Sequence, residues 1–65
     1  MTEELPRIGA PATRALTAVG VTRLSEVAAW TEAELLALHG VGPRAVRILA
    51  EALAERGLAL RSTSD

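Results

Sequence analysis

The sequence predicts an all-α protein, a single compact domain of four to five short helices within residues 1–65. No stretch alternates polar and apolar residues with the two-residue period of a β-strand. Glycine and proline occur at points that fit helix ends; inside a helix they would cost about 1 and 3 kcal/mol. A composition of 49% hydrophobic residues can form a small core. We expect this ordered core over about residues 5–60, between polar tails that fray.

Two helices are predicted in the first half of the chain. Pro11 suits the first position of a helix, where its missing N–H would be unpaired anyway. This helix should end at Gly20, because glycine readily adopts the left-handed conformation that closes a helix. Thr22 is the expected N-cap of a short second helix that carries Leu24 and Val27.

Two further helices are predicted in the second half. The sequence 31-TEAE-34 has the form of a capping box, so a third helix is expected over about residues 32–38. Pro43 begins the fourth and longest helix, which should reach Arg56 and be capped by Gly57. Because the connections are only two to four residues long, neighbouring helices must pack at steep angles.

Charged residues are sorted along the chain, although the net charge is only −1. All charges are positive over residues 5–25, negative over residues 26–34, and positive again over residues 35–50. A mildly acidic chain can therefore carry a cationic edge. The same pattern also fits solvated helix faces whose charges complement the helix dipoles. Charge alone leaves both interpretations open.

Residues suited to catalysis are scarce. The chain has no cysteine and no lysine, His39 is its one histidine, and its one aspartate is Asp65. We therefore expect no enzyme, no catalytic residue, no metal site and no cofactor. No apolar run reaches the roughly 18 residues of a membrane span, and the acidic start, residues 1–4, leads into no apolar run. We expect a cytoplasmic protein without membrane association.

The stretch 38-LHGVGPRAVRIL-49 carries the strongest functional pattern. Gly40 can take the positive φ that closes the third helix, and Val41 can tie the turn to the core. Gly42 lets another backbone or a ligand approach closely, and Pro43 starts the next helix. The turn therefore joins two helices and also presents backbone to its surroundings.

Such a turn exposes unpaired amides at a helix N-terminus, where the helix dipole is positive and phosphate binds readily. Pro43 has no N–H to donate. The candidate donors are the neighbouring amides of Val41, Gly42, Arg44 and Ala45. The guanidinium of Arg44 can add a bidentate grip on phosphate oxygens.

Residues 40-GVGPRAVRIL-49 resemble the helix-hairpin-helix motif, a hydrophobic-Gly-hydrophobic-Gly turn followed by proline, a basic residue and aliphatic positions. The resemblance implies DNA binding without sequence readout, through backbone amides and basic side chains on phosphates. The expected DNA-binding residues are Gly40, Val41, Gly42, Arg44, Ala45, Arg47 and Arg14. The alternative is a plain connector between two helices that binds no ligand.

Residues 8–60 are also similar to the C-terminal domain of the bacterial RNA polymerase alpha subunit, most clearly in 31-TEAELLALHGVG-42 and 51-EALAERGLAL-60. The resemblance implies a SAM-like fold of short helices around a helix-hairpin-helix core, with contacts to the minor groove and to regulators. That family's second-motif contact positions match Gly42 and Arg44. Pro11 occupies the position of its main DNA-contacting arginine, and Arg14 is the available substitute.

A weak internal repeat accompanies this resemblance. The run 15-ALTAVGV-21 is similar to 52-ALAERGL-58, and glycine-led turns, 8-IGAP-11 and 39-HGVGP-43, precede the two helices concerned. The repeat suggests two related helix-turn-helix halves, of which the first is degenerate.

The sequence leaves two functions open. The first is a monomeric, sequence-nonspecific module that binds the phosphate backbone of duplex DNA. The second is a protein-interaction module that kept the fold and lost nucleic-acid binding, as Pro11 and the net acidity permit. Ile48, one turn beyond Arg44, is either an extra core contact or an exposed apolar residue for a protein partner.

Overall fold

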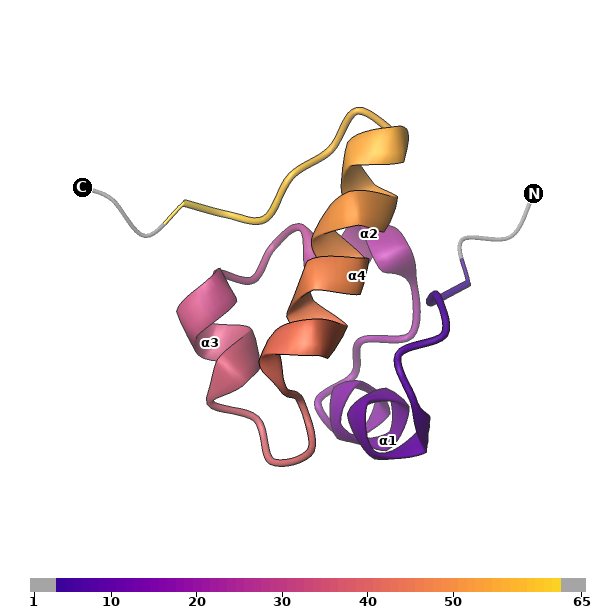
Figure 1. Cartoon of the computed structure of the whole chain (residues 1–65), viewed down its shortest axis with the longest axis vertical. Coiled ribbons are helices and arrows are strands. Elements are labelled where there is room, and N and C mark those ends of the chain that lie inside the picture. Colours follow the sequence, from indigo (N-terminus) through magenta and orange to yellow (C-terminus); the bar gives the residue numbers. More distant parts are fainter. Residues whose placement is uncertain (1–3, 63–65) are drawn as a thin grey trace.

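The computed structural model describes residues 4–62. Its helices are α1 (Ala10–Ala18), α2 (Leu24–Val27), α3 (Glu32–Leu36) and α4 (Pro43–Glu55). In Figure 1, α1 is seen nearly end-on while α4 runs upright, so these two helices cross steeply, in line with the short connections. The described residues form no β-sheet, and the predicted all-α class is confirmed. None of these helices is long and apolar enough to cross a membrane.

Helix α4 supplies the centre of the hydrophobic core. Its buried residues recur on one face, and both α2 and α3 pack against it. The buried cluster consists of Ala12, Leu16, Val21, Leu24, Val27, Leu35, Val41, Ala45, Val46, Leu49 and Leu53. Burying one such leucine or valine side chain stabilises the fold by about 1.5–3 kcal/mol before entropy is counted. The short helices are therefore held by packing around α4 rather than by their own helix propensity.

Helix α1 begins one residue earlier than predicted. Gly9 is its N-cap, with φ of +96°, and Pro11 lies at the second helical position rather than the first. Proline is tolerated there because none of the first four amides of a helix has a partner within the helix. The helix ends at Ala18, with Val19 as its C-cap, and the predicted left-handed conformation at Gly20 is confirmed by its φ of +83°.

The predicted N-cap of α2 is wrong by one residue. Arg23, not Thr22, occupies the N-cap position, with extended backbone. A carboxylate oxygen of Glu26 accepts hydrogen bonds from the amides of Thr22 and Arg23, at 2.9 and 3.1 Å. The glutamate inside the helix therefore provides the capping that was expected from the threonine hydroxyl.

The capping box of α3 is confirmed. The Thr31 hydroxyl accepts from the amide of Glu34 at 3.0 Å, and the Glu34 carboxylate accepts from the amide of Thr31 at 3.0 Å. The helix ends at Leu36, two residues before the predicted Leu38, because the Leu38 amide donates to the carbonyl three residues earlier and tightens the last turn. Helix α4 ends at Glu55, one residue before its predicted limit.

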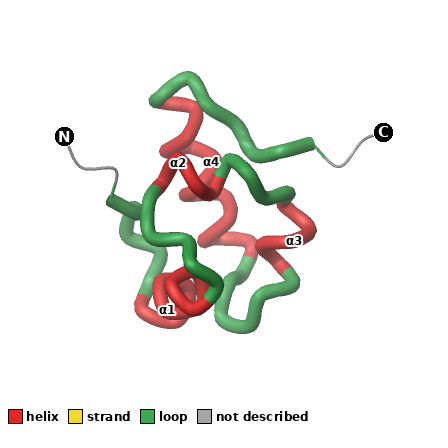
Figure 2. The backbone as a smooth tube through the Cα atoms, turned by 180° about the vertical axis from the view of Figure 1, so that it is seen from behind, coloured by secondary structure: helices red, strands yellow, loops and turns green. Residues whose placement is uncertain are grey.

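The first residue of the predicted C-terminal tail, Arg61, is held by hydrogen bonds. Its amide donates to the Trp30 carbonyl at 2.9 Å, and its guanidinium donates to the Ala29 carbonyl at 3.0 Å and to both Glu34 oxygens at 2.9 Å. Figure 2 shows the C-terminal segment running back from the end of α4 toward the α2–α3 connection. At the other end, Leu5 is half-buried against the core. Residues 1–3 and 63–65 of the predicted tails lie outside the described residues.

Candidate nucleic-acid interface

The turn between α3 and α4 has the shape that its glycines predict. Gly40 has φ of +97°, and Val41 is buried with 6% of its surface exposed. The amide of Val41 donates to the Leu38 carbonyl at 3.2 Å, so this amide is already engaged within the turn. Gly42 is the N-cap of α4, and Pro43 is its first residue. Of the four predicted donors, Val41 is therefore the one whose amide the fold already uses.

The other predicted donors differ in their access to solvent. No hydrogen bond within residues 4–62 engages the amides of Gly42, Arg44 or Ala45. Gly42 is partly exposed and Arg44 is exposed, whereas Ala45 has only 6% of its surface exposed. Gly42 and Arg44 are thus the members of this group that expose a substantial part of their surface.

Gly40 is fixed by two independent constraints. Its positive φ is strained for any residue with a side chain. A Cβ atom at this position would also lie 2.9 Å from the backbone carbonyl oxygen of Pro11. The turn before α4 therefore packs directly against the first turn of α1, and the two glycine-led turns of the internal repeat are neighbours in space.

Gly42 is under neither of these constraints. Its backbone, with φ of −105° and ψ of 178°, is extended and open to any residue, and a Cβ atom would meet nothing within 4 Å. Glycine here is not required by the packing of the described chain. Its effect is to leave the N-terminus of α4 open to close approach from outside.

Two surface depressions lie beside Gly40. The first, of about 370 Å³, lies between the two turns and is lined by Arg7, Ile8, Gly9, Gly40, Gly42, Arg44, Ala45 and Ile48. The second, of about 420 Å³, is lined by Pro11, Arg14, Ala15, His39 and Gly40. The N-cap glycines of both long helices, Gly9 and Gly42, thus face the same depression.

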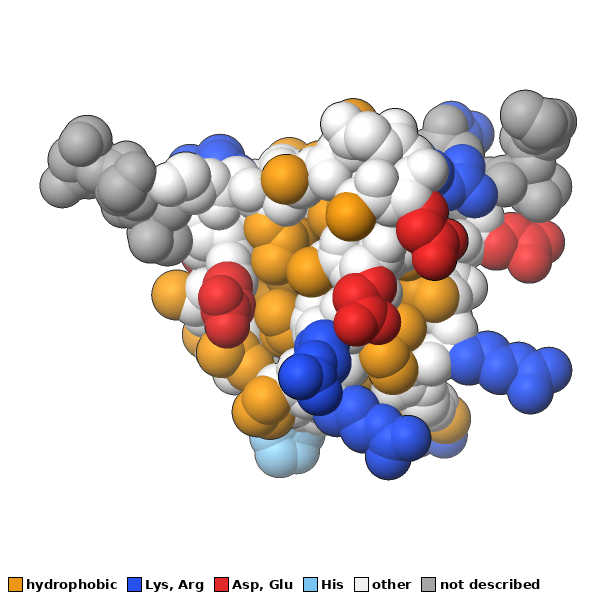
Figure 3. Space-filling model, turned by 45° about the horizontal axis from the view of Figure 1, so that its top comes forward, with side chains coloured by type: hydrophobic (Ala, Val, Ile, Leu, Met, Phe, Trp, Pro, Cys, Tyr) orange, Lys and Arg blue, Asp and Glu red, His pale blue; other side chains and the backbone are white. Residues whose placement is uncertain are grey.

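The charges around these depressions have one sign. Neither lining contains an acidic residue. Arg7, Arg14, Arg44 and Arg47 are exposed, and none forms an ion pair with a carboxylate among the described residues. Figure 3 shows several arginine side chains at the lower edge of the view, near the histidine, with glutamate side chains beside and above this group; other arginine side chains lie at the upper corners. The linings of the two depressions therefore carry positive charge and no acidic side chain.

The N-termini of α1 and α4 differ from those of α2 and α3 in whether an acidic side chain caps them. Helices α2 and α3 each carry glutamate in the first turn, and two of these glutamates, Glu26 and Glu34, accept hydrogen bonds from backbone amides at or just before the N-cap. Helices α1 and α4 have no acidic residue in the first turn and no side-chain cap. The partial positive charge of their N-termini, about half an elementary charge each, is therefore left uncompensated.

The three predicted arginines lie at different places relative to the two depressions. Arg44 lines the first depression and Arg14 the second, while Arg47 is exposed on α4 but lines neither. Arg7 lines the first depression although it was not among the predicted site residues. The internal repeat offered an indication of this role, because Arg7 directly precedes the turn 8-IGAP-11. In the repeat, that turn corresponds to the turn 39-HGVGP-43.

Ile48 is half-buried and lines the first depression together with Arg44. It is neither a core residue nor fully exposed, so it forms an apolar part of the candidate interface. His39 is exposed and lines the second depression. Within residues 4–62 no three histidine, aspartate or glutamate side chains are grouped so that they could hold a metal ion.

No protein-family model, curated protein or solved structure significantly matches the chain.

Proposed function

We propose that this chain is a helix-hairpin-helix module that binds DNA without sequence specificity, through the phosphate backbone. The observation that carries the proposal is the meeting of two uncapped helix N-termini at one edge, where the neighbouring side chains are arginines and no glutamate lines the surface. Positive helix ends with free amides favour anions, and the repeating anion of DNA is phosphate.

In this proposal the turn before α4 makes the main contact. The amides of Gly42 and Arg44 donate to oxygens of one phosphate, and the Arg44 guanidinium donates to the same or the next phosphate. The missing side chain at Gly42 allows the phosphate to approach the helix end. Contacts of this kind fix a protein on the duplex but carry no sequence information.

The turn before α1 contributes further positive charge. Arg7 lines the depression that both turns share, and Arg14 lines the neighbouring one. Pro11 supplies no side-chain contact, so these two arginines take over the cationic role in the first half of the repeat. With two to four phosphates neutralised, we expect a dissociation constant of about 10⁻⁴ to 10⁻⁶ M and a log–log salt slope of about −2 to −4.

The test compares two charge reversals with the same net charge. Arg44→Glu removes a contact at the proposed interface, whereas Arg56→Glu changes an exposed arginine at the opposite end of α4. In low-salt titrations with duplexes of different sequence, Arg44→Glu should weaken binding to every duplex equally, and Arg56→Glu should weaken it much less. Equal affinities of wild type and Arg44→Glu would refute the proposal.

A map of amide chemical shifts on DNA addition locates the surface independently. Shifts should concentrate at residues 7–14 and 39–47. A spectrum that DNA leaves unchanged would favour the protein-interaction function instead.

A further inference from the structure

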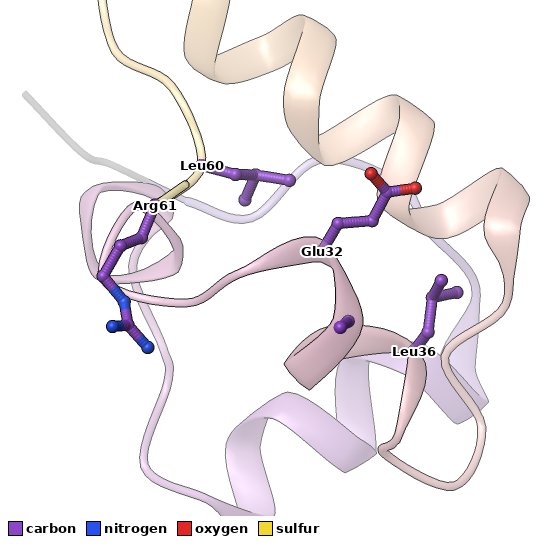
Figure 4. Close-up of a pocket in the computed structure, with 5 residues that line it drawn as sticks. Glu32, Leu36, Leu60 and Arg61 are labelled. Atoms are coloured by element: carbon purple, nitrogen blue, oxygen red, sulfur yellow. The ribbon is translucent and has the colours of Figure 1, made fainter. Parts of the chain in front are cut away.

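A second surface, built from α3 and the C-terminal segment, shares no lining residue with the proposed DNA interface. It is a groove of about 400 Å³ lined by Glu32, Ala33, Leu36, Leu60 and Arg61. Figure 4 shows the side chains of Glu32, Leu36 and Leu60 pointing into the same space, while the Arg61 guanidinium turns away from it. The groove thus has an apolar floor and one acidic group at its rim.

The wall formed by the C-terminal segment is held in place. The Arg61 amide donates to the Trp30 carbonyl, and the Arg61 guanidinium donates to the Ala29 carbonyl and to both Glu34 oxygens, all at 2.9–3.0 Å. Leu60 directly precedes this anchor and is half-buried against the core. A groove whose walls are already ordered loses little conformational entropy when it is filled.

The floor exposes apolar surface that the fold does not cover. Leu36 keeps 40% of its surface exposed, in a domain whose core depends on a small number of leucines and valines. Ala33 lies one helical turn before it on the same face of α3 and is also exposed. Covering this surface with another apolar side chain is favourable by roughly 25 cal/mol per Å².

The charges at the groove indicate the sign of the charge that its occupant carries. Glu34 and Arg61 are paired with each other and neutralise one another. Glu32 is exposed and has no ion-pair partner among the described residues. The rim therefore has one uncompensated negative charge, which is complementary to a lysine or arginine on a ligand.

The size of the groove indicates the kind of occupant. A stable interface between two folded proteins buries about 800 Å² on each partner, which would be a large share of this chain's total surface of 4505 Å². Five lining residues cannot supply that area, whereas a groove of about 400 Å³ accommodates one or two side chains of an extended or helical segment. We infer that the groove of Glu32, Leu36 and Leu60 docks a short segment of a partner protein that carries an aliphatic anchor beside a lysine or arginine.

The experiment uses the whole chain, labelled with ¹⁵N, and two capped hexapeptides. Both contain two leucines in an alanine background; one also contains two arginines and the other two glutamates. The arginine peptide should shift the amides of Ala33, Leu36, Leu60 and Arg61 at millimolar concentration, and the glutamate peptide should shift them less. Absence of these shifts, equal shifts with both peptides, or shifts centred on residues 39–47 would overturn the inference.

Single-residue variants test whether peptide binding depends on the groove residues. Glu32→Lys should reverse the preference between the peptides, and Glu32→Gln, which adds no positive charge to α3, should lower affinity for the arginine peptide about two- to fivefold. Leu36→Ala should lower affinity for the arginine peptide by up to about tenfold. Glu55→Lys, at an exposed position on α4, is the matched control and should leave both affinities unchanged.

Two controls distinguish peptide docking from self-association and from binding at the DNA interface. A dilution series without peptide detects a second copy of the chain as the occupant, since concentration-dependent shifts at Ala33 and Leu36 would assign the groove to self-association and overturn the inference. Arg44→Glu should leave peptide binding intact. The groove and the DNA interface can therefore fail independently of each other.

Discussion

A Cβ atom on Gly40 would lie 2.9 Å from the carbonyl oxygen of Pro11, so the turn before α4 and the first turn of α1 touch backbone to backbone. This contact joins two segments that are far apart in the sequence. It fixes the N-terminus of α1 relative to that of α4, and the depression lined by Gly9 and Gly42 exists because both turns are held in this way.

Gly40→Ala should destabilise the fold by more than about 2 kcal/mol. The substitution combines the strain of a positive φ, about 1–2 kcal/mol, with a clash against backbone that cannot move aside easily. Gly20→Ala is the control, because Gly20 also has a positive φ but open space around it, so only the strain applies. Urea denaturation of the two variants measures the difference, and equal losses would show that the contact with Pro11 is not tight.

Gly42→Asp should change stability and DNA binding in opposite directions. Aspartate at an N-cap can accept from the free amides and complement the dipole, which stabilises α4 by about 0.5–1 kcal/mol. The same carboxylate occupies the proposed phosphate position and should abolish measurable DNA binding. Ser25→Asp makes the same charge change at an exposed position on α2 and should leave DNA binding nearly unchanged. Thermal denaturation and a low-salt DNA titration provide the two readouts.

Arg7→Ala and Arg14→Ala should each reduce the magnitude of the salt slope of DNA binding by about one, because each removes one phosphate contact. Arg56→Ala should leave the slope unchanged. Titrations at four or more salt concentrations determine these slopes. If Arg7→Ala binds with the wild-type slope, the first turn takes no part in the interface.

Glu34 should make stability depend on acid pH. The hydrogen bond from the Thr31 amide, followed by that from Arg61, lowers the pKa of this carboxyl below its ordinary value of 4.5. A lowered pKa in the folded state gives stability that is present above the ordinary value and is lost as the pH falls through the folded-state pKa. Glu34→Gln should therefore be less stable than wild type at pH 7, and the difference should shrink below pH 4.5. Denaturation at pH 7 and at a pH below 4.5 tests this, and a stability difference between Glu34→Gln and wild type that does not change with pH would contradict it.

Much of the fold was predictable because helix ends in this chain are marked by residues with local effects. The Thr31–Glu34 capping box and the glycine ends of α1 and α3 act over a few residues, so the sequence alone indicates them. The N-cap of α2 was missed because Glu26 reaches back to two amides and replaces the expected threonine hydroxyl. At this helix start, capping by a glutamate side chain took the place of capping by a threonine hydroxyl.

The candidate site was only partly predictable. Gly40, Gly42 and Arg44, which line the first depression, belong to the single short stretch 38–49 that the sequence singled out. Arg7 was missed because its place beside Gly42 depends on how α1 packs against the turn before α4. The use of the Val41 amide within the turn depends on hydrogen-bond geometry that residue types do not specify. Long-range contacts of this kind are visible only once the chain is folded.

The anchoring of Arg61 sets a practical limit on how far the domain can be trimmed. Cutting the chain after Leu60 would delete the guanidinium that compensates Glu34 and would release the segment laid along α3. A fusion partner or affinity tag attached beyond Ser62 would leave the hydrogen bonds of Arg61 in place. Expressed chains that retain Arg61 should therefore keep the C-terminal segment bound to the rest of the domain.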